Sequence, residues 1–152
     1  MPADTIRVSI HELAPSIAEI TAAGGTVEMT VAGNSMKPTL LNRESTVRLT
    51  AITEPKRGDM VLYRRDSGVY VLHRVVKVCG DGSCVFCGDA QYQPETGIRR
   101  DQMLAVVCAF CRRRRWISCD DPRYRCWWRL CVGLRGWRRV SAAVKRRLRR
   151  LF

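Results

Sequence analysis

The stretch "VYVLHRVVKV", Val69 to Val78, decides the fold class because its apolar residues alternate with a period of two. Val71, His73 and Val75 fall on one face of an extended chain, as in a half-buried β-strand. Comparable β-rich runs, separated by short Gly- and Pro-containing turns, occupy residues 45–52, 59–65 and 102–110. The pattern predicts a mostly β domain of the α+β kind, with a curled antiparallel sheet or partial barrel.

A helix is expected before the first strand. Ser9 and Glu12 have the spacing of a capping box, and Gly24 and Gly25 would end the helix. Pro15 is tolerated only near a first turn, so the helix is expected to begin a few residues after Ser9. Its apolar side comprises Ile10, Leu13, Ile17 and Ile20, while His11 lies on the exposed side and is assigned no chemistry.

The charge of the chain is unevenly distributed. Residues 112–152 hold 15 of the 27 Lys and Arg but 2 of the 14 Asp and Glu, so this segment carries the whole net charge of +13. The longest apolar run, Met103–Cys111, has nine residues, about half of what a membrane-spanning helix needs. The N-terminus shows no secretory pattern, so a cytoplasmic location is expected.

Three residues could form a catalytic group. Ser35 lies in the bend "GNSMKPTL" after an alternating strand at residues 27–31, and a serine needs a base to remove its proton. Histidine occurs only at positions 11 and 73, which leaves His73 as the base. Asp89 follows Gly88 directly after a predicted strand. Taken singly, each residue is more often part of a turn or a core.

The order of four segments resembles the superfamily of type I signal peptidases and SOS-repressor autoproteases. The segments are "GNSMKP" (33–38), "RGDMVLYR" (57–64), "YVLHRVVKV" (70–78) and "CGDAQ" (87–91), and the resemblance covers roughly residues 25–110. Bacterial leader peptidases and repressors carry a lysine as the base, whereas the endoplasmic-reticulum and archaeal signal peptidases carry histidine followed by Arg-Val. The "HRVV" sequence at His73 is similar to the second branch.

The resemblance implies roles for individual residues. Ser35 would attack the peptide carbonyl, His73 would act as general base and acid, and Asp89 would orient the imidazole, with Glu95 in reserve for that role. Lys77 is a second candidate base, but four residues along a strand place it about 13 Å from His73.

The same resemblance implies an oxyanion and substrate-binding segment around the nucleophile, formed by the backbone N–H of Ser35 with Asn34, Met36 and Pro38. Gly33 stands where bacterial leader peptidases have a hydroxyl residue, which makes the site more like that of the repressor branch. A peptide or protein substrate with small residues before the cut would pair with the strand preceding Ser35. No cofactor is expected.

The cysteines offer a metal-binding alternative. The two Cys-x-x-Cys pairs have the spacing of a zinc ribbon and comprise Cys84, Cys87, Cys108 and Cys111. Cys87 adjoins the Gly-Asp segment and Cys108 lies in an apolar strand, where cysteine acts as a small hydrophobic residue. Unligated thiols are therefore favoured over structural zinc.

The basic segment repeats apolar residues at helical intervals over residues 124–152, with arginines between them. This pattern is typical of an amphipathic helix on an anionic membrane surface, although packing on the domain or binding of nucleic acid would leave a similar pattern. We therefore expect an N-terminal helix at 1–24, a signal-peptidase-like catalytic domain at 25–118 and a basic tail at 119–152. The expected function is a serine endopeptidase held peripherally on the inner face of a membrane. The alternative is a catalytically inactive relative that binds membrane or nucleic acid.

Overall fold

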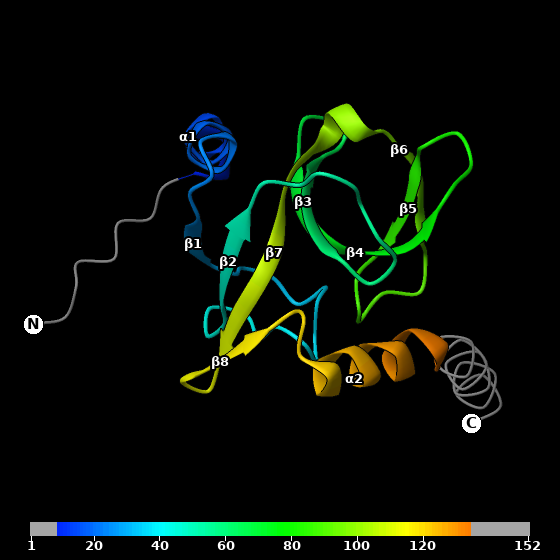
Figure 1. The fold of residues 1–152 in the computed structure, drawn as a ribbon. Coiled ribbons are helices and arrows are strands. Elements are labelled where there is room, and N and C mark those ends of the chain that lie inside the picture. The colour runs from blue at the N-terminus through cyan, green and yellow to red at the C-terminus, as the bar shows by residue number, and fades with distance from the viewer. Residues whose placement is uncertain (1–8, 135–152) are drawn as a thin grey trace, which may run out of the picture.

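The computed structural model describes residues 9–134, which form two α-helices and eight β-strands (Figure 1). The helices are α1 (Ile10–Ala22) and α2 (Pro122–Gly133). The strands are β1 (Val27–Thr30), β2 (Thr46–Thr50), β3 (Met60–Arg64), β4 (Tyr70–Val78), β5 (Cys84–Cys87), β6 (Glu95–Ile98), β7 (Met103–Arg112) and β8 (Arg115–Ser118). A short 3-10 helix, Arg100–Gln102, precedes β7.

The strands form one antiparallel sheet with the order β1-β2-β7-β3-β4-β5-β6, and β8 pairs with β7. The sheet is not closed, and β1 and β6 lie at the two ends of this order. The prediction of a mostly β domain with an antiparallel sheet is therefore confirmed. The position of β1 also places the strand that precedes Ser35 at a sheet edge, as expected.

Strand β3 is buried on both faces, and its alternation separates two cores. Met60 and Leu62 belong to the core that also contains residues of α1, α2 and β7. Val61 and Tyr63 point to the other face, where they pack with residues of β4, β5 and β6. Successive side chains of a strand point to opposite faces, so one short strand contributes to both cores.

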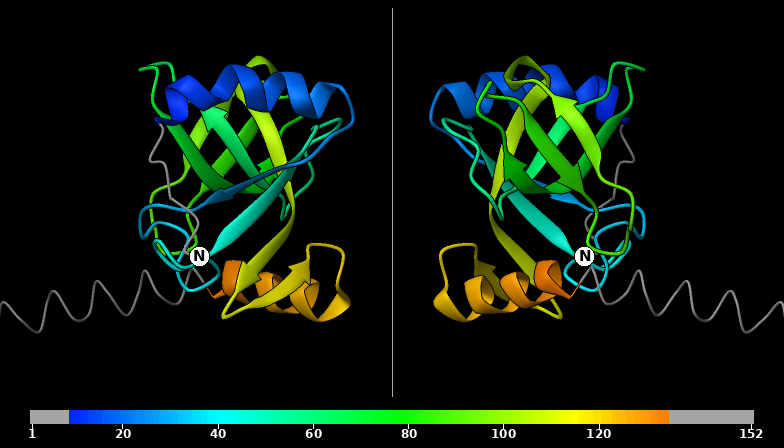
Figure 2. Two further views of the ribbon diagram at one scale, coloured as in Figure 1. Left: turned by 90° about the vertical axis from the view of Figure 1, so that its left-hand side faces the viewer. Right: turned by 90° about the vertical axis from the view of Figure 1, so that its right-hand side faces the viewer.

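Helix α1 begins at Ile10, with the Ser9 side chain accepting a hydrogen bond from the backbone N–H of His11. The helix was expected to start later because of Pro15, but it accommodates this proline inside its length. Ile17 is buried in the first core, and this contact outweighs the helix-breaking tendency of proline. Figure 2 shows α1 and α2 at opposite ends of the sheet.

Helix α2 packs on the domain, which differs from the expectation of a separate tail starting at residue 119. Tyr124 and Trp128 are buried in the first core, and a Cβ atom at Gly58 would lie 2.2 Å from the Trp128 ring. Burial of two aromatic side chains holds this part of the basic segment to the sheet. The predicted tail residues after Leu134 lie outside the described part of the chain. None of the helices formed by residues 9–134 has the length and apolar character required to span a bilayer.

Candidate active site

The bend after β1 holds Ser35 between two deeply buried anchors. Met36 is 2% exposed and Leu40 is fully buried, and both pack in the first core. The backbone N–H of Gly33 donates to Oδ1 of Asn42 at 2.8 Å and closes the base of the bend. With Met36 turned into the core, Ser35 is half-buried at the surface of the bend.

Ser35 lies directly against the turn that follows β5. Its carbonyl oxygen accepts a hydrogen bond from the backbone N–H of Ala90 at 2.8 Å. A Cβ atom at position 88 would lie 2.5 Å from the same carbonyl oxygen, so only glycine fits there. The turn from Gly88 to Ala90, which includes the Gly-Asp segment, therefore packs against the serine-bearing bend. We call this turn the seat of Ser35.

His73 lies on β4, next to the strand end that carries this seat. Arg74 of β4 pairs with Cys87 of β5 in an antiparallel register, so His73 and Gly88 come next along the two strands. His73 is 2% exposed and pairs with Val61, which places its side chain on the face of the second core. The predicted nucleophile and base thus come from segments that meet at the turn after β5.

Two side chains fix one nitrogen of the imidazole. The Tyr63 hydroxyl lies 3.2 Å from Nδ1 of His73 and donates to Oε2 of Glu95 at 2.9 Å. Because that hydroxyl has only one proton, its oxygen acts as the acceptor toward Nδ1, which must then carry the ring proton. A neutral imidazole that carries its proton on Nδ1 has its lone pair on Nε2, and a general base needs such a lone pair.

Glu95 supplies a negative charge behind the imidazole. Its Oε1 lies 3.5 Å from Nδ1 of His73, and its Oε2 accepts a hydrogen bond from Nε of Arg65 at 3.0 Å. The hydrogen bonds from Arg65 lower the pKa of Glu95 below its ordinary value of 4.5, against the opposing effect of its partial burial. Burial and the bond to Glu95 raise the pKa of Tyr63, so its hydroxyl keeps the proton.

Asp89 forms a buried ion pair with Arg74. Its Oδ1 accepts from Nε of Arg74 at 2.8 Å and its Oδ2 accepts from Nη2 at 2.7 Å, and both side chains are fully buried. The Thr39 hydroxyl also donates to Oδ2. The carboxylate predicted to orient His73 is therefore engaged by a buried arginine, and Glu95, the reserve candidate, stands beside Nδ1.

Arg74 joins four segments of the chain through its guanidinium group. Besides Asp89 and Thr39, it donates from Nη1 to the carbonyl oxygen of Gly58 at 2.8 Å and to the Tyr124 hydroxyl at 2.9 Å. Burial opposes its charge, but the bonds to Asp89 and Tyr124 outweigh this effect and raise the pKa of Arg74. The bend of Ser35, the turn after β5 and helix α2 are thus tied to β4 at one point.

The remaining predicted residues surround the bend or lie away from it. Asn34 is exposed and its carbonyl oxygen accepts from the backbone N–H of Lys37 at 3.2 Å, so it forms part of the turn. Met36 is a core anchor, and Pro38 is half-buried in the same bend. Lys77, the second candidate base, is exposed near the far end of β4.

The structure separates the two cysteine pairs. Cys84 and Cys87 lie on β5, whereas Cys108 and Cys111 lie on β7, and β3 and β4 run between these strands. Three strand spacings amount to about 14 Å, while a zinc ion holds its sulfur ligands at about 2.3 Å. Within residues 9–134, no three Cys, His, Asp or Glu side chains gather as a metal site. The zinc alternative is therefore not compatible with this fold.

Three contributors were missed from the sequence, namely Tyr63, Arg65 and Arg74. The first two lie on or just after β3, and the short turn between β3 and β4 sets the register that brings Val61 opposite His73. The "DSG" turn at residues 66–68 joins these two strands. A hairpin register deduced from this turn would have placed Tyr63 diagonally across from His73 on the same face of the sheet. Arg74 could have been noticed as a lone charge within an apolar strand.

Comparison of the chain with protein-family models, with curated proteins and with solved structures finds no match in any of the three.

Proposed function

We propose that the protein is a serine endopeptidase of the signal-peptidase type, with Ser35 as nucleophile and His73 as general base. The observation that carries this proposal is a buried imidazole held at Nδ1 by Tyr63 and Glu95, on the strand next to the seat of Ser35. A histidine fixed in this tautomer by a charged partner is the arrangement that serine hydrolases use to activate a hydroxyl.

In the proposed reaction, Oγ of Ser35 attacks the carbonyl carbon of the substrate while its proton passes to Nε2 of His73. The backbone N–H of Ser35 donates to the oxyanion that forms. The negative charge of Glu95, 3.5 Å from Nδ1, stabilises the imidazolium. The imidazolium then gives its proton to the leaving amine, and water hydrolyses the acyl-enzyme with His73 again as the base.

The edge position of β1 supports the expected mode of substrate binding. β1 pairs only with β2 in the described sheet, and it leads directly into the bend of Ser35. An extended peptide that paired with β1 as an additional strand would run alongside it toward the bend that carries Ser35. The proposal therefore includes a peptide or protein substrate and, through residues 124–152, peripheral attachment to the inner face of an anionic membrane.

The proposal is tested by covalent labelling. The full chain is incubated with a peptide-based serine-directed probe that carries small residues before the reactive carbonyl, and adducts are read by intact mass. We expect one adduct on the wild-type chain and none on Ser35→Ala, since removal of a triad nucleophile lowers turnover by several orders of magnitude.

The matched control is Ser83→Ala, which removes another serine hydroxyl from a turn remote from the site, where it donates to Asp81 at 2.7 Å. This variant should label like the wild type. Loss of labelling in His73→Gln with retained folding would place the imidazole in the reaction. Equal labelling of wild type and Ser35→Ala would rule out the peptidase assignment.

A further inference from the structure

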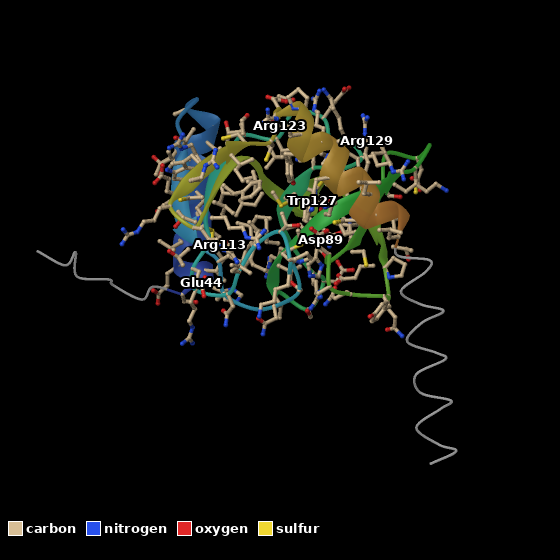
Figure 3. The ribbon with its side chains drawn as sticks, turned by 90° about the horizontal axis from the view of Figure 1, so that it is seen from below. Glu44, Asp89, Arg113, Arg123, Trp127 and Arg129 are labelled. Atoms are coloured by element: carbon tan, nitrogen blue, oxygen red, sulfur yellow. The ribbon has the colours of Figure 1, made fainter. Side chains whose placement is uncertain are left out.

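A cationic cavity lies at the end of the molecule where α2 and the β7–β8 hairpin meet. Its volume is about 540 Å³. Four arginines line it together with two tryptophans, namely Arg112, Arg113, Arg115, Arg123, Trp116 and Trp127. Figure 3 shows Arg113 of the hairpin and Arg123 and Trp127 of α2 on this lower face, with Glu44 on the same face but outside the lining.

The arginines in the lining of this cavity outnumber its carboxylates by four to one. Among residues 9–134, none of its four guanidinium groups takes part in an ion pair. The lining contains one carboxylate, Asp121, and its Oδ1 already accepts from the backbone N–H of Arg123 at 2.7 Å as the cap of α2. Four arginines beside one carboxylate give the lining a net positive charge, which favours the binding of an anion.

Arg112, which lines the cavity, also has a donor that the described residues do not satisfy. Its Nε atom is buried and has no hydrogen-bond partner within the part of the chain that the structure describes. A buried donor of a charged group without an acceptor is costly, at about 1–3 kcal/mol.

The turn of the β7–β8 hairpin carries two arginines in an unusual backbone conformation. Arg113 and Arg114 have φ values of 50° and 64°, the left-handed conformation in which a two-residue turn normally carries Asn and Gly. Side chains other than these are strained at such positions.

An apolar stripe runs along α2 away from the cavity. Trp127, Leu130 and Leu134 follow one another at helical spacing, in line with Arg123 at the helix start. Leu130 is 59% exposed and Leu134 is 53% exposed, whereas the adjacent face of the helix is buried in the core. A ligand seated in the cavity would therefore lie with its charged end among arginines and an apolar body against this stripe.

We infer that the cavity binds the phosphate group of an anionic lipid headgroup. Guanidinium groups pair with phosphate oxygens in a forked geometry, tryptophan favours the membrane interface, and exposed leucines enter the acyl region. Nucleic acid would satisfy the arginines but would leave the leucine stripe in water. The inference deepens the proposed membrane attachment and does not depend on the peptidase chemistry.

The test compares two neighbouring residues of one turn. Arg113→Gln removes a charge that lines the cavity, and Arg114→Gln removes a charge that does not, at a similar backbone conformation. Binding of the full chain is measured by co-sedimentation with phosphatidylcholine vesicles that contain or lack phosphatidylglycerol. We expect Arg113→Gln to weaken binding to the anionic vesicles about ten- to hundredfold, and Arg114→Gln by about fivefold or less, the effect of one charge near an anionic surface.

Further arms separate the sources of phosphate and the two parts of the proposal. Soluble glycerol phosphate should compete with the vesicles for the wild-type chain, and Arg123→Gln, checked for folding by circular dichroism, should repeat the loss. The inference would be overturned if the two turn variants weakened vesicle binding equally. It would also be overturned if the chain bound glycerol phosphate but not vesicles, or if it bound duplex DNA more tightly than vesicles in an Arg113-dependent way. Ser35→Ala should bind vesicles like the wild type, so failure of the peptidase proposal leaves this result unaffected.

Discussion

Replacing Asp89 and Glu95 one at a time by the corresponding amide tests which carboxylate stabilises the fold and which assists the imidazole of His73. Asp89→Asn should mainly destabilise the protein, whereas Glu95→Gln should mainly impair catalysis. The reason lies in their partners, because Asp89 accepts from the buried Arg74 and Glu95 stands beside Nδ1 of His73.

The expected loss of unfolding free energy in each variant follows from the burial of the carboxylate and the number of hydrogen bonds it accepts. Asp89 and Arg74 are both fully buried and share two hydrogen bonds, at 2.7 and 2.8 Å. Breaking such a pair leaves an uncompensated buried cation and costs about 3–5 kcal/mol, which lowers Tm by about 6–20 °C for a domain of this size. Glu95 and Arg65 are 25% and 37% exposed, so the loss of their ion pair costs about 1 kcal/mol or less.

The two variants are compared by urea unfolding and by hydrolysis of a cleavable peptide at a temperature where both are folded. Glu95→Gln should lower kcat by about 10²–10⁴-fold, because the imidazolium loses its charged partner. Asp89→Asn should retain most of its activity per folded molecule. The opposite outcome, wild-type stability with lost activity in Asp89→Asn, would refute the assignment of Asp89 to Arg74. Glu54→Gln, which changes an exposed carboxylate elsewhere, is the control for both measurements.

Three further predictions concern two glycines and the pH dependence of stability. Gly88→Ala should reduce peptide cleavage about 10²-fold, because its Cβ would displace the Ser35 backbone, with which it would make a 2.5 Å contact; normal kinetics would contradict this. Gly58→Ala should lower the free energy of unfolding by about 1–3 kcal/mol, measured in urea, because Cβ would meet the Trp128 ring at a residue whose φ is 102°. The lowered pKa of Glu95 contributes stability that is present above about pH 4.5 and is lost as pH falls through its folded pKa. The urea midpoint of Glu95→Gln should therefore fall less than that of the wild type on acidification, and parallel curves would contradict the assignment.

Much of the sheet could be predicted from periodicity, and the exceptions have local causes. β3 and β4 follow the quoted runs closely because their apolar residues are buried against two cores. β8 was missed because its turn consists of Arg113 and Arg114, which give no turn signal although both adopt positive φ. The short β6 has no clear strand pattern in its sequence, which includes Gly97, and it forms through its pairing with β5. Tertiary pairing overrode local propensity in both cases.

The candidate site was predictable in its segments but not in its pairings. Sequence order pointed to the bend of Ser35, to His73 and to the turn with Asp89, and the structure brings these three segments together. Which acid faces the imidazole depends on which face of the sheet each residue occupies. Glu95 opposes Phe86, which packs in the second core together with the face of His73. Because β6 lacks a clear strand pattern, the sequence could not show which face Glu95 occupies.

The adjacent pair His73 and Arg74 explains why one strand can serve both stability and chemistry. Because neighbours on a strand point to opposite faces, the imidazole faces Tyr63 and Glu95 while the guanidinium faces Asp89 and the first core. The arginine holds the turn after β5, and that turn holds the backbone of the serine-bearing bend. Placement of the hydroxyl relative to the imidazole therefore depends on the hydrogen bonds of Arg74 to Thr39 and Asp89, one of which an amide oxygen at position 89 can still accept. Removal of the Arg74 side chain should consequently impair cleavage even when the chain remains folded, because the seat of the nucleophile loses its tie to the strand of the base.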